Sequence, residues 1–388
     1  MSLAAGSYRD LRYIMEGAWG TTPGTPTFIS IRNTGGGGLT GSRGELVSAE
    51  MRSDRAITAM RLGIMEASLE LPFELTYLTF EDWFEAALFD DFAAAYAFSS
   101  LTIAADSSAK TFTATTQNFE TGGVEVGDYV VITGMTTAGN NSTFLVSGVT
   151  AKVITCSTAT GMATEAGSGD ETLTTTRMVL DAGTTQKFMS IEEAQTDISV
   201  FQTALGMMIN TMNMTFTNSS IITGSFGLLG KSLEDPAGST DANAVTAVNT
   251  NDPFDSFTGS ITDDTVALAI ATSLDFALAN GLEQKFALFS DEAHHVAVGR
   301  VNLTGNISLY FEDDTYIDDY INESTSVLQW EAEDPDGNAY RFTVPKCKLS
   351  AQSKSVSENE VLLNCGWRGL YDSTYGTTFR IEKRPGSV

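Results

Sequence analysis

Short stretches in which apolar and polar residues alternate dominate this chain of 388 residues. In the clearest of them, 67–74, Leu69, Leu71 and Phe73 fall on one face of an extended strand, because successive side chains in a strand point to opposite sides. Further extended stretches are expected at 8–16, 27–32, 207–216, 219–229, 285–289, 297–303, 306–312, 327–333, 340–345 and 360–369. The pattern predicts a mainly β protein.

Two segments have helical periodicity instead. Apolar residues at i, i+3, i+4, i+7 and i+8 predict an amphipathic helix at about 80–89; they are Phe80, Trp83, Phe84, Ala87 and Leu88. A second helix is predicted at 316–322. Each helix follows an alternating strand that ends in glutamate, at 67–74 and 305–312. The pair is either a duplicated strand–helix element or a chance likeness between two alternating strands.

The stretch 98–178 differs in composition from the sequence on both sides of it. It is rich in Thr, Ser, Ala and Gly, has few charges, and contains short β-like runs separated by turns with glycine. Regular short strands with turn signals are typical of a small β-barrel or sandwich. We therefore expect an inserted β-domain at 98–178 and a discontinuous body formed by 1–97 and 179–388.

Two segments of the body are expected to be loops. Residues 234–264 are rich in Asp, Asn, Thr, Ala and Ser, which predicts a long exposed loop or arm. Residues 35–38 are four successive glycines, whose backbone loses much conformational entropy when it is fixed. This run is therefore predicted to be a flexible loop.

The charge is strongly unbalanced, with 49 acidic and 22 basic residues and a formal net charge of −27. Such a chain is expected to repel nucleic acid and anionic membranes rather than bind them. The excess acid serves either as a solubilising surface or as a wall past which DNA moves without sticking.

Cysteine usage and hydropathy fit a reducing, aqueous compartment. Cys156, Cys347 and Cys365 are far apart and form no CxxC pair, so no disulfide framework is expected. The N-terminal residues lack the apolar core of a signal peptide, and no apolar run approaches the roughly 20 residues that span a bilayer. We expect a protein that is made and used without a membrane.

No constellation of residues indicates catalysis, a cofactor or a metal. His294 and His295 are adjacent, so on a strand they point apart and cannot easily share an ion. The acidic cluster 312–319 lacks the spacing of a calcium loop, and 224–231 lacks the interval of a phosphate-binding loop. Carboxylates are numerous enough to leave a glycosidase pair open, but no pair is singled out. We predict no catalytic, cofactor-binding or metal-binding residue, and no enzyme.

The opening run Tyr13-Ile-Met-Glu-Gly-Ala-Trp-Gly-Thr-Thr-Pro23 resembles the start of the tail tube proteins of long-tailed bacteriophages. The stretch 44–55 resembles a loop of that family, and 222–231 resembles its central strand. The resemblance covers roughly 1–97 and 185–388. The stretch 98–178 is similar to a small β-domain that is inserted in some members.

The resemblance implies a tail-tube-like β-barrel or sandwich body with two flanking helices. It also implies self-assembly into hexameric rings, stacked into the tube through which the genome leaves the virion. The implied partners are further copies of the chain and the tail terminator, tape measure and distal tail proteins, while DNA passes through the lumen without specific binding. The implied location is the virion tail, after assembly in the host cytoplasm. The alternatives are a non-enzymatic β-domain protein that binds a surface or a carbohydrate and, less favoured, a carboxylate-dependent glycan hydrolase.

Overall fold

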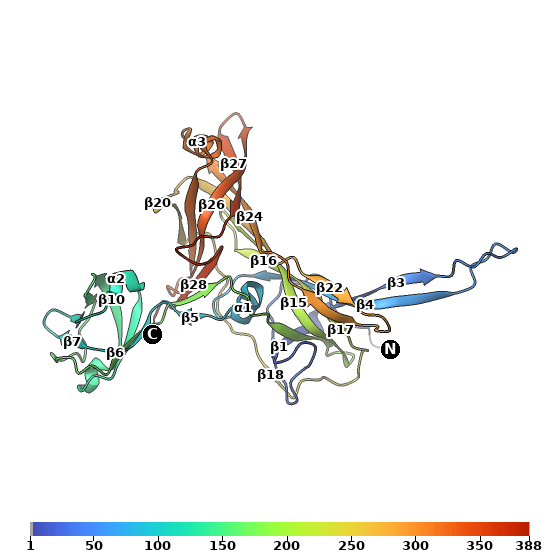
Figure 1. Cartoon of the computed structure of the whole chain (residues 1–388), viewed down its shortest axis with the longest axis horizontal. Coiled ribbons are helices and arrows are strands. Elements are labelled where there is room, and N and C mark those ends of the chain that lie inside the picture. The colour runs from blue at the N-terminus through green and yellow to red at the C-terminus, as the bar shows by residue number, and fades with distance from the viewer. Residues whose placement is uncertain (1–2, 388) are drawn as a thin grey trace.

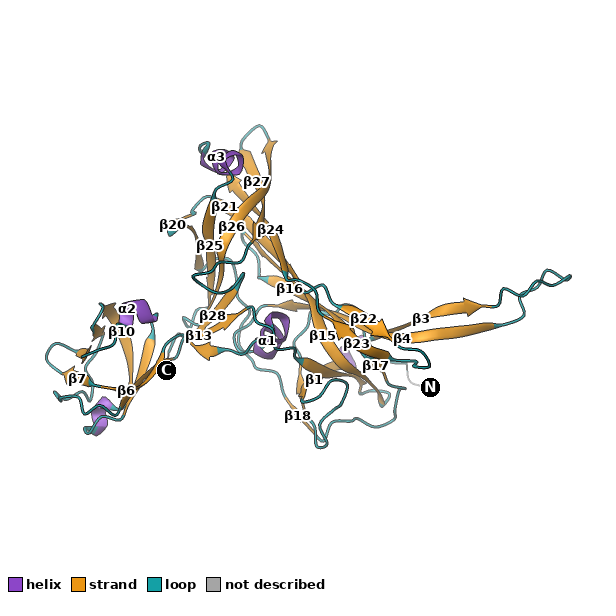
Figure 2. Cartoon of the chain, viewed as in Figure 1, coloured by secondary structure: helices purple, strands orange, loops and turns teal. Residues whose placement is uncertain are grey.

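The computed structural model describes residues 3–387, and strands dominate it (Figure 2). These strands form a 19-stranded sheet, a 7-stranded sheet and a 2-stranded hairpin. The expected mainly β, sandwich-like body is therefore confirmed. The sheets are open, and no closed barrel is seen within 3–387.

The first half of the body is built around one long strand, β15 (Val200–Thr217). β14 (Phe188–Gln195) pairs with its beginning and β16 (Thr223–Gly230) with its end, so the extended stretches predicted at 207–216 and 219–229 form a hairpin. β4 (Met60–Glu74) then pairs with β16. The outer strands are β1 (Arg9–Glu16), β2 (Thr27–Ser30), β3 (Thr40–Val47), β17 (Ser232–Leu233) and β18 (Ala244–Thr246).

The second half is built around another long strand, β26 (Ala339–Val356). β25 (Thr325–Glu333) and β27 (Val361–Gly369) pair with it, and β24 (Asn302–Tyr310) pairs with β27. The outer strands are β19 (Gly259–Asp263), β20 (Val266–Ala267), β21 (Ala271–Ala279) and β28 (Arg380–Arg384). β21 also pairs with the end of β15 and so joins the halves; Figure 1 shows the second half, in orange and red, standing above the first.

The two predicted helices are present as α1 (Glu81–Leu88) and α3 (Thr315–Asn322). Trp83 and Phe84 of α1 are fully buried and pack on Phe226 of β16. Leu69, Leu71 and Phe73 line the same core, as their alternation predicts. α3 has no fully buried residue, and its Tyr316 and Ile317 are partly buried against the core.

The predicted strand at 297–303 is wrong. β23 (Ala293–Ala297) pairs with β22 (Glu283–Phe286), and the next strand begins only at Asn302. Between them the Gly299 N–H donates to the Asn280 carbonyl at 3.1 Å, and a Cβ on Gly299 would lie 2.7 Å from the Gly281 carbonyl oxygen. The chain folds back on itself there, which ends the strand.

The stretch expected as an insertion contains a separate sheet with its own core. Phe112, Phe119 and Phe144 are among the buried residues of that core. A stem of β5 (Ala93–Ala94) and β13 (Met178–Asp181) connects it to the body, at the left of Figure 1. The domain boundaries 98–178 and 1–97 with 179–388 stay a prediction. The elements of this sheet are β6 (Ala97–Leu101), β7 (Ile103–Asp106), β8 (Thr111–Ala114), β9 (Tyr129–Thr133), β10 (Thr143–Val149), β11 (Val153–Cys156) and β12 (Glu171–Thr175), with α2 (Phe119–Gly122) beside it.

The segment 234–264 runs along the body. β18 lies beside β2 in parallel, and Phe254 is fully buried. The element that projects is the hairpin of β3 and β4, at the right of Figure 1. The role of 234–264 as an arm stays a prediction. No helix among the described residues has the length and apolar character needed to cross a bilayer.

Candidate functional surfaces

A polar sheet face runs across the strands that join the two halves of the body. Side chains of directly paired residues lie on the same face of a sheet, so the strand pairings define rows across it. We call the following four rows the polar face: Glu70, Gly227, Thr211, Ala279 and Asn302; Pro72, Ser225, Asn213, Ala277, Thr304, Arg368 and Lys348; Glu74, Thr223, Thr215, Asp275, Asn306, Gly366 and Ala351; and Thr217, Ser273, Ser308, Asn364 and Ser353. The alternate positions of the same strands carry the apolar core.

The side chains of the polar face are small, hydrogen-bonded and net acidic. The Asn306 side-chain amide donates to Asp275 at 3.0 Å, and the Ser308 hydroxyl donates to Asn364 at 2.7 Å. Its three acids are Glu70, Glu74 and Asp275, against two bases, Arg368 and Lys348, and Lys348 is ion-paired with Glu323 at 2.7 Å. The face is therefore smooth and negatively charged. Sequence periodicity does not predict this face, because its rows depend on pairings between strands far apart in the sequence.

The carboxylate of Glu16 holds the first turn of the chain onto the central strand. It is buried, and it accepts hydrogen bonds from the Gly206 N–H (2.8 Å), the Gly20 N–H (2.6 Å) and the Ser190 hydroxyl (2.7 Å). Gly206 lies in a bulge of β15 with φ +62°, and the Trp19 indole N–H donates to its carbonyl at 3.0 Å. The Glu-Gly-Ala-Trp-Gly run thus ties the first turn of the chain to the bulge of β15. We call this set of hydrogen bonds to Glu16 and Gly206 the clasp.

A buried arginine fixes the seven-stranded sheet against the body. Arg177 is 4% exposed; its Nε donates to Asp128 at 2.8 Å, and its Nη1 donates to Glu382 of β28 at 2.6 Å. Glu125 pairs with Arg341 of β26 at 2.8 Å. Burial alone would raise the pKa of Glu125, but the charges of Arg177 and Arg341 hold it below its ordinary value. This ionic network sets how the inserted part sits on the body.

The distal part of the β3–β4 hairpin, 43–61, is exposed along its whole length. Met51 is 96% exposed and Ile57 is 73% exposed. The same segment carries four arginines, Arg43, Arg52, Arg55 and Arg61, which is unusual in a chain of net charge −27. Exposed apolar side chains on a projecting hairpin are typical of an interaction site.

The residues considered for chemistry do not converge. His294 and His295 are exposed on β23, and no group of three or more His, Cys, Asp or Glu within 3–387 is placed to hold a metal. The three cysteines are free and buried, and burial raises the pKa of Cys156 and Cys365 to about 11 and that of Cys347 to about 12. Such thiols are weak nucleophiles at neutral pH.

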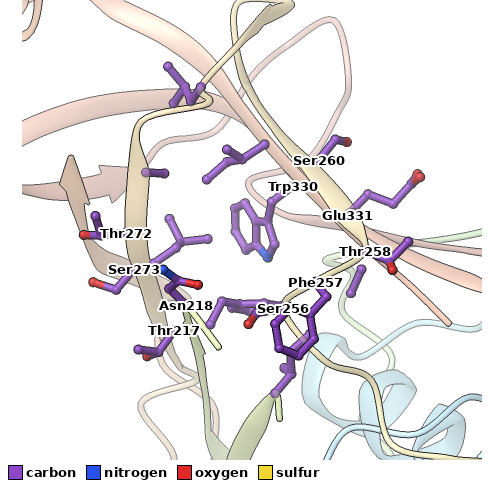
Figure 3. Close-up of a pocket in the computed structure, with 18 of the residues that line it drawn as sticks. Thr217, Asn218, Ser256, Phe257, Thr258, Ser260, Thr272, Ser273, Trp330 and Glu331 are labelled. Carbon is purple, nitrogen blue, oxygen red and sulfur yellow. The ribbon is translucent and has the colours of Figure 1, made fainter. Parts of the chain in front are cut away.

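A pocket of about 460 Å³ lies where the two halves of the body meet (Figure 3). Figure 3 shows Trp330 across its middle and Phe257 at its near side. The acids that line it are Asp255 and Glu331, and Glu331 is ion-paired with Arg341 at 2.9 Å.

A smooth polar sheet face, open sheet edges and a projecting hairpin define a structural β protein built to contact other molecules through its surfaces. The sequence model of the phage tail tube protein family matches residues 6–369. The chain therefore belongs to the phage tail tube protein family, whose members are structural components of the virion tail. A comparison with curated proteins gives no match.

Proposed function

We propose that the protein self-assembles into rings with six tube units, the hexameric arrangement that the family resemblance implies. The rings stack into the tail tube, and the genome leaves the virion through its lumen. The observation that carries this proposal is the polar face, which spans strands from both halves of the body. A wall of this kind is what a passage for DNA requires.

The charge of the polar face supports its placement on the inside of the tube. Duplex DNA carries about one negative charge per 1.7 Å of axis, so a basic lumen would bind it at every ring. Glu70, Glu74 and Asp275 would instead repel phosphates that come within a Debye length, about 8–10 Å. DNA then passes without specific binding, and the protein needs no catalytic group.

The projecting hairpin supports stacking of one ring on the next. Its apolar and basic side chains suit a partner surface on another, predominantly acidic copy. The ends of such a tube would meet the tail terminator, the tape measure and the distal tail proteins, which are the further partners that we propose. Assembly would take place in the host cytoplasm.

A charge reversal on the polar face tests this function. The double variant Glu70→Lys with Thr215→Lys places two exposed lysines in the proposed lumen. We expect tubes of this variant, assembled with duplex DNA, to retain nuclease-protected DNA that is released by salt. The control Glu120→Lys with Thr121→Lys makes the same charge change on α2 and should retain none. Equal retention by both variants would show that the polar face is not the lumen wall.

A further inference from the structure

The two halves of the body repeat one topology, apart from the pieces inserted in each. The order β1, β2, β3, β4, α1, β14, β15, β16, β17 in the first half corresponds to β19, β20, β21, β24, α3, β25, β26, β27, β28 in the second. The strand before the helix pairs with the same later strand in both: β4 with β16, and β24 with β27. The first strand also pairs alike: β1 with β14, and β19 with β25. The strand–helix likeness in the sequence is part of a duplication of the whole body.

Irregularities in the two long strands fix the alignment of the halves. β15 and β26 are both 18 residues long. Each has one bulge opposite the strand before it and a second bulge opposite the strand after it. The positions that mark these bulges are 204, 207 and 210 in β15 and 344, 347 and 350 in β26, so the shift between the strands is 140 residues at all three.

The strand pairings carry this alignment across the sheet. Residue 211 of β15 corresponds to 351 of β26, and the residues opposite them are Gly227 and Gly366. Opposite those lie Glu70 and Asn306. Two positions earlier on the same strands, Ser68 faces Thr40 and Thr304 faces Ala277. Thr40 of β3 therefore corresponds to Ala277 of β21.

Along the polar face, the halves are joined by the pairing between 211–217 of β15 and 273–279 of β21, while β13 of the stem pairs separately with β28. The corresponding edge of β26, from residue 351 onward, has no strand on that side among the described residues. β3, which corresponds to β21, is exposed along its whole length and pairs only with β4 there. Each chain therefore carries one unpaired side of this junction on β26 and the other on β3. An open strand edge of this kind is a template for pairing with another strand.

We propose that β26 of one chain pairs in antiparallel fashion with β3 of the next copy, reproducing the junction between the halves. Ser353 then lies opposite Thr40 of the next copy, as Asn213 lies opposite Ala277 within the chain. Val356, 73% exposed, corresponds to Phe216, which packs on Trp330 across the internal junction. The contact is head to tail, so it closes a ring when the rotation between units allows it.

The glycine run 35–38 continues the proposed pairing beyond Leu39. Arg9 at present donates to the carbonyls of Gly36 (3.2 Å) and Gly37 (2.7 Å), so pairing of this part requires that Arg9 release them. The absence of Cβ atoms in the run lets a neighbouring backbone come close.

The duplication sets the number of chains in a ring. Resting on the proposed function, in which a ring has six tube units, two units per chain mean that three chains complete it. The polar face would then continue from Ala351 of one chain to Ser42 of the next and around the lumen.

Cross-linking through paired cysteines tests the contact and the number together. The double variant Thr40→Cys with Ser353→Cys places thiols on directly opposite residues, whose Cβ atoms are about 4.5–5.5 Å apart in antiparallel pairs. Oxidation or a short bismaleimide should produce a ladder on a denaturing gel that ends at three chains. The variant Asn213→Cys with Ala277→Cys is the matched control, and it should cross-link within one chain only. Glu120→Cys with Ser353→Cys and the wild type give the background.

The outcomes separate this inference from the proposed function. A ladder that reaches six chains would overturn the three-chain ring. Normal tubes of the double variant without any cross-link above background would overturn the pairing of β26 with β3 and leave the tube function standing. A wild-type chain that forms neither rings nor tubes by electron microscopy would overturn the proposed function itself.

Discussion

At the scale of single residues, sequence patterns predict which side chains are buried. They predict less well which other residues those side chains contact. The alternation of Leu69, Leu71 and Phe73 predicts one buried face, and all three are buried. The partners of Glu16 could not be predicted, because Gly206 and Ser190 lie far along the chain and meet Glu16 only through strand pairing. The resemblance marked Glu16 as a recurring residue without giving its physical role.

Replacing Glu16 with glutamine should weaken the clasp. The amide keeps the shape of the carboxylate but turns an NH₂ group toward N–H donors, so at least one buried donor loses its acceptor. We expect a loss of about 1–3 kcal/mol in the free energy of unfolding, measured by denaturant titration. Glu120→Gln on exposed α2 is the control and should change stability little. Equal stability of the wild type and Glu16→Gln would contradict the clasp.

At the scale of elements, the helices at 80–89 and 316–322 and most strands follow from local periodicity. The strand predicted at 297–303 fails because Gly299 packs on the Gly281 backbone, which is a tertiary contact. The β3–β4 hairpin is not predicted from the sequence, since alternation is weak where both faces of a strand are exposed. Which strands pair, and hence the polar face, cannot be read from periodicity at all.

The contact between the inserted sheet and the body should depend on Arg177. Arg177→Met leaves the buried carboxylates of Asp128 and Glu382 without their shared cation. Removing one partner of a buried ion pair in this way lowers stability by about 3–5 kcal/mol. We expect faster proteolysis in the stem next to residues 93–94 and 178–181, measured by limited digestion and mass spectrometry. Exposed Arg300→Met is the control, and equal digestion of the two variants would contradict the anchoring role.

The hairpin tip should be needed for stacking but not for ring formation. Replacing 48–59 with an Asn-Gly turn removes exposed residues only, so the fold should survive. We expect single rings in place of long tubes in negative-stain images. A Gly/Ser segment of equal length keeps the reach and removes the side chains, and it should fail in the same way. Long tubes from the shortened chain would assign stacking elsewhere, with 234–264 as the next candidate.

At the scale of the whole molecule, the sequence hints at the duplication without giving its extent. The likeness of 67–74 to 305–312 places Leu69 with Ile307, whereas the strand pairings place Leu71 with Ile307. The difference of two residues keeps the same face inward, so periodicity cannot tell the alignments apart. The halves also differ in burial, since α1 is deeply buried and α3 is not.

The inserted sheet should be dispensable for the tube. Residues 97–175 can be replaced with a short Gly/Ser bridge that leaves the β5–β13 stem and Arg177 in place. The sheet has its own core, so we expect soluble chains that still form tubes, seen by negative stain. Aggregation of the shortened chain would show that the insertion completes the core of the body, against the predicted domain boundaries.

The most direct test of the central claim is a cryo-electron microscopy reconstruction of the polymer that the wild-type chain forms. The account predicts a hollow tube of stacked rings, with Glu70, Glu74 and Asp275 facing the lumen and the β3–β4 hairpins reaching the adjacent ring. A chain that stays monomeric, or a tube with the polar face on its outside, would contradict it.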